Sequence, residues 1–155
     1  MKKVFFVLIA FFMLNLQSFA TTWVQVGDYE FIDKDSINYY TNDRGEVLYG
    51  TKVYWMKTLY HDGEYFKQAQ TGIEKKIAYI LSQRIIDVNK KAVTTKAIIY
   101  YDEQGNTIIS YSPEDFELKW SAIVPNSRGE LWYELVRKPR YLKKMYKYQL
   151  KQQNQ

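Results

Sequence analysis

The sequence predicts an α+β fold in which an antiparallel β-sheet carries a C-terminal α-helix packed on one face. Two observations support this prediction. Segments that alternate apolar and polar residues, rich in β-branched and aromatic side chains, follow one another through most of the chain, and such alternation is typical of half-buried strands. A clear helix start comes only late, at Ser127. A run of strands followed by a helix favours a sheet with the helix against one face.

The first 20 residues have the three regions of a cleavable signal peptide. Lys2 and Lys3 form a positive start, residues 4–14 form an apolar run without a charge, and small residues surround Ala20. The run is shorter than the roughly 20 residues that span a bilayer, so a membrane anchor or a buried helix is the less favoured alternative. No cysteine follows it, so we do not expect a lipoprotein. We expect cleavage after Ala20 and export to the periplasm or the cell surface.

The part of the chain that follows is expected to form strands separated by turns. Residues 23–32 are a strand interrupted at Gly27-Asp28, and in residues 33–37 Asp and Ser side chains can bond their own backbone in a turn. Residues 42–45 form a second turn. Residues 46–59 form a long strand with period-two alternation at Val47, Tyr49, Thr51, Val53 and Trp55.

The middle of the chain contains the clearest hairpin. Residues 61–64 are expected to be a turn, and residues 65–72 are less regular. Residues 72–88 fit either a helix or a strand, and the even spacing of their apolar residues favours a strand for the second half. A polar turn at residues 89–91 precedes the hairpin. The hairpin consists of the strand 92–101, the loop 102–106 and the strand 107–111, and its loop contains the glycine that such loops favour.

The predicted helix starts at Ser127, after a loop and a short irregular segment at residues 112–120. Glu130 follows Ser127 by three residues, which predicts a reciprocal cap in which each side chain bonds a free backbone N–H. Leu131 and Leu135 lie one turn apart and provide an apolar face. Pro139 should end or kink the helix near Lys138, because proline cannot continue the hydrogen-bond ladder.

We divide the chain into a signal peptide at 1–20, one domain at 21–138 and a basic aromatic tail at 139–155. In the tail, Tyr141, Leu142, Met145 and Tyr148 recur at helical spacing between lysines, and residues 152–155 should fray. Lysines with aromatic residues suit an anionic lipid interface, but a solubilising or disordered tail is favoured over it, since charge runs are usually solvated. The tail residues predicted to contact a membrane or a partner are Arg140, Tyr141, Lys143, Lys144, Tyr146, Lys147 and Tyr148.

The charge is unevenly distributed along the chain. The 22 basic and 17 acidic residues give a net charge of +5. Residues 137–155 contain seven basic residues and no acidic one, whereas residues 21–136 have a net charge of −4. For an exported protein we expect no nucleic-acid partner; anionic lipid, cell-wall polymer or an acidic protein face suits the basic segment. Removal of the signal peptide leaves 135 residues without a cysteine, so the mature chain must rely on packing.

Few residues suggest catalysis. The chain has no cysteine, and its one histidine, His61, lies in a charged turn where a solvated side chain is more usual than a catalytic base. Asp33 and Asp35, with Ser36, could offer oxygens to a hard cation, but a turn cluster is favoured. For a second acidic cluster, a solvated loop is favoured over a pair of glycosidase carboxylates; its members are Glu114, Asp115 and Glu117. We expect no enzyme, no cofactor and no metal site.

The 15 tyrosines and the basic residues of the predicted sheet are candidates for contact with a partner. Tyr39-Tyr40 and Tyr100-Tyr101 could be a binding surface or an ordinary consequence of strand propensity; in such pairs one ring faces the core and the other faces out. The predicted partner-binding surface is the outer face of the sheet, with Arg84, Lys90, Lys91 and Lys96.

Short motifs occur in an order that resembles the surface-adhesin protein E family of exported bacterial proteins, and the similarity covers most of residues 23–138. They are Trp23-Val24, Tyr29-Glu30-Phe31-Ile32-Asp33 with Asp35-Ser36-Ile37, Val53-Tyr54-Trp55, Tyr101-Asp102-Glu103-Gln104-Gly105 and Trp120-Ser121-Ala122-Ile123-Val124-Pro125-Asn126-Ser127. The resemblance implies a bent antiparallel sheet with the C-terminal helix on its concave face. It also implies a binding role at the cell surface, typically towards host extracellular proteins.

The chain departs from the family pattern in two ways. Family members often join the helix to the sheet by a disulfide, and protein E is lipid-anchored; here no cysteine lies near Ser82 or Arg137, or anywhere else. We predict a non-enzymatic exported binding protein, with adhesion to host extracellular proteins as its role. The alternative is a periplasmic or envelope accessory protein whose basic tail docks on anionic lipid or a partner subunit. The expected partner is a protein or an anionic surface polymer, and a homodimer remains open.

Overall fold

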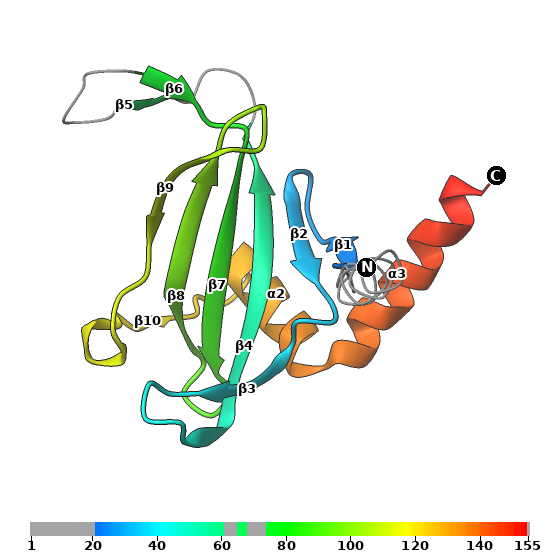
Figure 1. The fold of residues 1–155 in the computed structure, drawn as a ribbon. Coiled ribbons are helices and arrows are strands. Elements are labelled where there is room, and N and C mark those ends of the chain that lie inside the picture. The colour runs from blue at the N-terminus through cyan, green and yellow to red at the C-terminus, as the bar shows by residue number, and fades with distance from the viewer. Residues whose placement is uncertain (1–20, 61–64, 68–73, 155) are drawn as a thin grey trace, which may run out of the picture.

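The computed structural model describes residues 21–60, 65–67 and 74–154. They form a large antiparallel sheet covered by two C-terminal helices, with a small two-stranded hairpin at one end (Figure 1). The predicted α+β fold is therefore confirmed. The predicted signal peptide and the turn that contains His61 lie outside the described residues.

The large sheet has eight strands in the order β1-β2-β4-β7-β8-β10, with β3 paired to β4 and β9 paired to β8. Every described pairing is antiparallel. The strands of this sheet are β1 (Trp23–Gln25), β2 (Glu30–Asp33), β3 (Asn38–Thr41), β4 (Val47–Leu59), β7 (Tyr79–Asp87), β8 (Ala92–Tyr101), β9 (Thr107–Tyr111) and β10 (Ser121–Ala122). The separate hairpin consists of β5 (Tyr65–Lys67) and β6 (Glu74–Lys76).

The long strands β4, β7 and β8 form the centre of the sheet. They confirm the strands predicted at 46–59, in the second half of 72–88 and at 92–101, and the loop at 102–106 leads into β9 as predicted. Gly105 in this loop has a φ of 79°, a conformation that side chains with a Cβ rarely adopt. The register between β7 and β8 shifts between Gln83 and Arg84, which is a β-bulge.

Strand β3 is not predicted by the alternation pattern, because it is only four residues long. It pairs with β4 across the turn at 42–45, and β2 and β3 lie end to end along one edge of β4. The expected division within a tyrosine pair is found here, since Tyr39 is exposed and Tyr40 is buried.

The main core lies between the sheet and the helices. One cluster joins Val24, Ile32 and Met56 of the sheet to Val136 and Leu142 of the two helices, and each of these side chains is fully buried. Burial of a large aliphatic side chain contributes about 1.5–3 kcal/mol. The helices are therefore held to the sheet mainly by this apolar contact.

Helix α2 (Arg128–Arg137) begins at the predicted residue. The Oγ atom of Ser127 accepts a hydrogen bond from the Glu130 N–H at 3.3 Å, and the Glu130 carboxylate accepts one from the Asn126 N–H at 2.8 Å. The Glu130 carboxylate thus accepts from the N–H of the residue before the N-cap, and not from the N–H of the N-cap residue Ser127 itself. Asn126 turns the chain at this point with a φ of 60°. The helix start is confirmed.

Helix α3 (Pro139–Gln153) follows α2 after a break at Lys138, as Pro139 predicts. It runs beside β1 at the edge of the sheet (Figure 1). Leu142 is buried, and the Gln149 side chain accepts a hydrogen bond from the Gln25 N–H and donates one to the Gln25 carbonyl. A disordered tail is therefore wrong for residues 139–153, because one side of this helix packs on the sheet.

Candidate partner-binding surfaces

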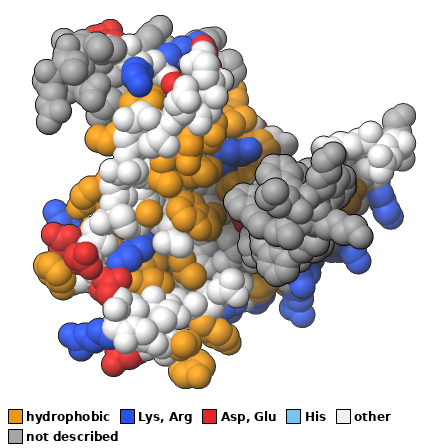
Figure 2. Space-filling view, viewed as in Figure 1, with side chains coloured by type: hydrophobic (Ala, Val, Ile, Leu, Met, Phe, Trp, Pro, Cys, Tyr) orange, Lys and Arg blue, Asp and Glu red, His pale blue; other side chains and the backbone are white. Residues whose placement is uncertain are grey.

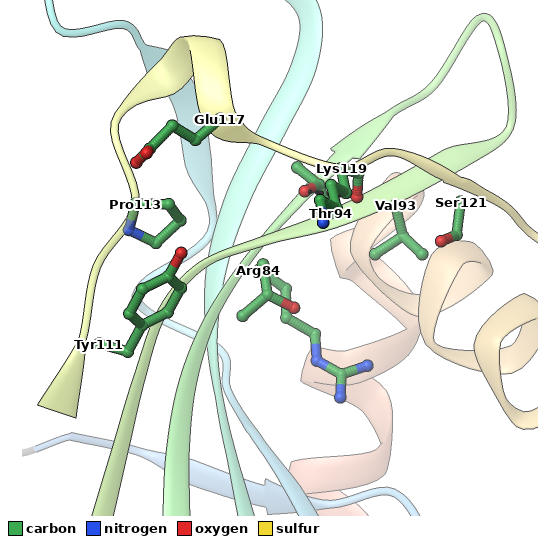
Figure 3. Close-up of a pocket in the computed structure, with 9 residues that line it drawn as sticks. Arg84, Val93, Thr94, Tyr111, Pro113, Glu117, Lys119 and Ser121 are labelled. Atoms are coloured by element: carbon green, nitrogen blue, oxygen red, sulfur yellow. Dashed lines mark hydrogen bonds between the residues drawn. The ribbon is translucent and has the colours of Figure 1, made fainter. Parts of the chain in front are cut away.

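Arg84 does not lie on an outer face of the sheet, where it was expected. It lies on the face that α2 covers, with its guanidinium carbon 4.7 Å from the centre of the Trp132 ring and the buried Tyr54 as its cross-strand neighbour. Figure 3 shows the Arg84 side chain pointing away from Tyr111 and toward the helices. The predicted placement is wrong because β7 buries apolar residues on both faces, so alternation does not reveal which face the helices cover.

Lys90 and Lys91 lie in the turn between β7 and β8. Lys90 is exposed, and its Nζ atom lies 3.7 Å from the Asp87 carboxylate. The Nζ atom of Lys91 lies 3.2 Å from the carboxylate of Glu130, in the first turn of α2. Lys91 therefore supports the start of the helix, while Lys90 faces solvent.

Lys96 lies at the centre of a charged cluster that joins two distant parts of the chain. Its Nζ atom is 2.8 Å from a carboxylate oxygen of Asp43 and 2.8 Å from one of Asp115. The Asp43 N–H donates to the Asp115 carboxylate at 2.6 Å, and the Asp115 N–H donates to the Asp43 carboxylate at 2.8 Å. The Tyr40 hydroxyl also donates to Asp115. We call these four residues the clasp; it fixes the β3–β4 turn to the short 3₁₀ helix η1 (Asp115–Glu117).

The charges of the clasp stabilise one another. Burial by itself would raise the pKa of Asp115, but hydrogen bonds from Lys96 and Tyr40 outweigh it and leave that pKa below its ordinary value. The hydrogen bond from Lys96 lowers the pKa of Asp43. Burial opposes the charge of Lys96, yet the two carboxylates raise its pKa. Asp115 therefore belongs to an ion-pair network and not to a solvated acidic loop, whereas Glu114 and Glu117 are exposed.

An open groove of about 440 Å³ lies beside the clasp, and we call it the aromatic groove. Phe116 is 88% exposed, and Trp120 and Leu48 are also exposed at 45% and 39%. Figure 2 shows hydrophobic side chains beside acidic ones where η1 and the β3–β4 turn meet, at the lower left. The groove is lined by Tyr40, Asn42, Asp43, Arg44, Leu48, Glu114, Asp115, Phe116, Leu118 and Trp120. The clasp holds the turn that carries Phe116, so this ring is presented from a fixed position.

A second hollow, of about 420 Å³, lies at the edge of β8 between the parts that pair with β9 and β10 (Figure 3). Tyr111 and Pro113 are on one side of it and Val93 and Ser121 on the other. Glu117 and Lys119 bring charges of both signs. This hollow has no apolar anchor as exposed as Phe116.

The outer side of α3 carries two parallel stripes of side chains. Residues at i, i+4 and i+7 share one side of a helix. Tyr141, Met145 and Tyr148 form an aromatic stripe at this spacing, with both tyrosines exposed. The neighbouring basic stripe is one residue earlier at the same spacing and consists of Arg140, Lys144, Lys147 and Lys151. Figure 2 shows Lys and Arg side chains along this helix, at the right.

Two predicted contact residues of α3 lie outside these stripes. Tyr146 is half-buried, with the Lys34 Nζ atom 5.2 Å from its ring centre. Lys143 is exposed and lies toward Asp35, whose pKa is lowered first by its hydrogen bond with Lys34 and to a smaller degree by Lys143. The structure thus brings five of the seven predicted residues together on the outer side: Arg140, Tyr141, Lys144, Lys147 and Tyr148.

Asp33, Asp35 and Ser36 form a turn, which is the interpretation that the sequence favoured over a cation site. The Asp33 carboxylate accepts a hydrogen bond from the Asp35 N–H at 3.1 Å, and the Asp33 carbonyl accepts one from the Ser36 hydroxyl at 2.8 Å. In the described part of the chain, no three carboxylate or histidine side chains come together in a way that could hold a metal ion. None of the described helices is long and apolar enough to cross a membrane.

The aromatic groove could not be located from residue spacing. Its walls come from residues 40–48 and 114–120, which meet only in the folded chain. One local signal is present in the sequence: Phe116 stands between Asp115 and Glu117, where a charged environment opposes burial of the ring. A single exposed aromatic residue, however, is ordinary in any protein surface.

Neither a protein-family model nor a curated protein sequence matches this chain. Crystal form II of Haemophilus influenzae protein E is similar in structure, with a TM-score of 0.50 at 11% identity over 74% of this chain and 85% of that chain. The crystal structure of protein E from non-typeable Haemophilus influenzae also has a TM-score of 0.50, at 11% identity over 77% of each chain. The resemblance inferred from the motifs is confirmed at the level of the fold, and the chain has a protein E-like fold.

Proposed function

We propose that this protein is a non-enzymatic binding protein that is exported, loses residues 1–20 and adheres at the cell surface to an extracellular protein. Support comes from the protein E-like fold, for which the family resemblance implies binding to host extracellular proteins. It comes also from a surface suited to contact with another protein. That surface is the aromatic groove.

The observation that carries this proposal is the exposure of Phe116 on a fixed turn. A large apolar ring that is 88% exposed gains most when it enters a pocket of a partner, and aromatic anchors of this kind dominate binding energy at interfaces. Because the clasp already holds the turn, little conformational entropy is lost on binding. The exposed carboxylates of Glu114 and Glu117 on either side of its turn suit a partner face that presents lysine or arginine.

A second function, that of an envelope accessory protein, is favoured by a separate observation. Helix α3 contains five basic residues and no acidic one, with exposed tyrosines beside them. Such a face suits an anionic lipid surface or an acidic partner subunit. The two functions predict different locations and use different surfaces, so they can be tested separately.

Location is tested in the native host by blotting the mature protein in surface, periplasmic and medium fractions, with protease shaving of intact cells. Shaving-sensitive protein at the surface would support adhesion. Protein that is found only inside the envelope would contradict adhesion and favour the accessory function.

Binding is tested on a panel of immobilised extracellular-matrix proteins. For a matrix protein that the wild type binds, Phe116→Ser should weaken binding about 30-fold, as truncation of an anchor residue does. Tyr148→Ser is the matched control, because it removes another exposed aromatic ring (65% exposed) from a different surface, and it should bind as the wild type does. Absence of binding by the wild type, or equal binding by both variants, would contradict adhesion through the groove.

A further inference from the structure

We infer that α3 lies flat on an anionic lipid bilayer, with its aromatic stripe at the depth of the headgroups and its basic stripe on the phosphates. This inference rests on the second proposed function and names the surface on which α3 docks. It does not depend on the aromatic groove, which lies in another part of the molecule.

The aromatic stripe provides a contiguous apolar contact that α3 can offer to a surface without unfolding. Tyr141 and Tyr148 are 43% and 65% exposed, and Met145 lies half-buried between them. Together with the stems of Lys144 and Gln149 they line a shallow hollow of about 340 Å³. A tyrosine ring has an apolar body and a polar hydroxyl, which suits the boundary between headgroups and acyl chains.

The basic stripe is placed to meet phosphate groups at the same time. Arg140, Lys144, Lys147 and Lys151 lie next to the aromatic stripe along the 15-residue helix, a length of about 22 Å. All four are exposed, and no ion pair to a carboxylate is found for them within the described part of the chain. Their charge is therefore available to an external anionic surface, and long basic side chains can extend to phosphates beside a buried apolar face.

The side of α3 that carries Leu142 and Gln149 is already packed against the rest of the protein, which fixes the direction of the two stripes. Leu142 is fully buried in the core cluster, and Gln149 bonds both backbone groups of Gln25. The helix is therefore formed before docking, so a bilayer need not fold it. A long straight face with charge of one sign suits a flat lipid surface better than a compact protein pocket, and for this reason we assign the bilayer and not a partner subunit.

The test is sedimentation of the processed protein, purified from an exporting host, with vesicles of equimolar phosphatidylglycerol and phosphatidylcholine. We expect binding that weakens as salt rises, because surface charge attraction is screened, and no binding to pure phosphatidylcholine. Lys144→Gln/Lys151→Gln should weaken binding about 30-fold, since each basic residue near such a surface strengthens binding about fivefold. Tyr141→Ser/Tyr148→Ser should also weaken it.

The matched control is Lys75→Gln/Lys90→Gln, which removes the same charge from exposed positions on β6 and on the β7–β8 turn. It should bind as the wild type does. Equal loss in the control and the α3 variants, equal binding to both kinds of vesicle, or no binding at all would overturn the inference. If the protein is found inside the envelope yet does not bind anionic vesicles, the accessory function stands with a partner subunit in place of lipid, and only the lipid assignment fails.

Discussion

The Nζ atom of Lys52, on β4, lies 3.2 Å from the carbonyl oxygen of Val136 near the end of α2. It lies at the same distance from the carbonyl oxygen of Arg137, the last residue of that helix. The last carbonyls of a helix lack partners within the helix, and a cation is favoured there by the helix dipole. Burial lowers the pKa of Lys52, so holding its charged form between the sheet and α2 costs some desolvation free energy. The sheet therefore caps the helix that packs on it.

Lys52→Met should lower the free energy of unfolding by about 1–2 kcal/mol, because two helix carbonyls lose a charged donor while the aliphatic volume is kept. Urea unfolding measures this change. Lys90→Met, at an exposed turn position, should change the free energy by less than about 0.5 kcal/mol. Equal effects of the two substitutions would show that the Lys52 contact does not stabilise the fold.

Arg84→Gln should lower the free energy of unfolding by about 1 kcal/mol through loss of the cation–π contact with Trp132. The fluorescence of Trp132 should change with it, since the indole ring loses its neighbouring charge. Lys90→Gln serves as the control and should leave both unchanged. A variant that loses partner binding but keeps its stability and fluorescence would instead restore Arg84 to an outer binding face.

Local pattern was enough to predict most of the strands and the helix start, but not the direction in which strand residues point. Strand β4 was predicted because its alternation is long, and α2 because Ser127 and Glu130 lie three residues apart. On β7 both Ile85 and Ile86 are buried, so the pattern does not say which face carries the helices. Arg84 was misplaced for that reason.

The candidate surfaces depend on contacts between distant residues to different degrees. The α3 stripes follow from helical spacing, so the sequence predicted most of their residues. The clasp joins Asp43 to Asp115, 72 positions apart, and no local pattern predicts such a contact. The groove beside it was missed because it exists only once the clasp has formed.

The clasp predicts how stability depends on acid. The pKa of Asp115 in the folded chain is lowered from 3.8, so its carboxylate stabilises the fold fully above the unfolded pKa. As the pH falls through 3.8 toward the lower folded value, the unfolded chain takes up the proton first and this stabilisation is lost.

Asp115→Asn should therefore be less stable than the wild type at neutral pH, and the difference should shrink as the pH falls below about 4. Urea unfolding across this pH range measures the two curves. Glu117→Gln is a control on the same turn, where the exposed side chain accepts a hydrogen bond from the nearby Glu114 N–H at 3.0 Å. If the Asp115→Asn curve stays parallel to that of the wild type throughout, the clasp is not closed in solution.

Leu142→Ala should lower the free energy of unfolding by about 2–5 kcal/mol, the usual cost of emptying a buried leucine site. Leu142 is fully buried in the core cluster, whereas Leu150 on the same helix is 39% exposed. Leu150→Ala is thus a matched control, with the same chemical change and the same effect on helix propensity, and should cost less than about 1 kcal/mol. Urea unfolding followed by far-UV circular dichroism compares the two variants. Equal costs would mean that α3 does not rest on the sheet through Leu142, and the stripes on its outer side would then have no fixed direction in which to face a membrane.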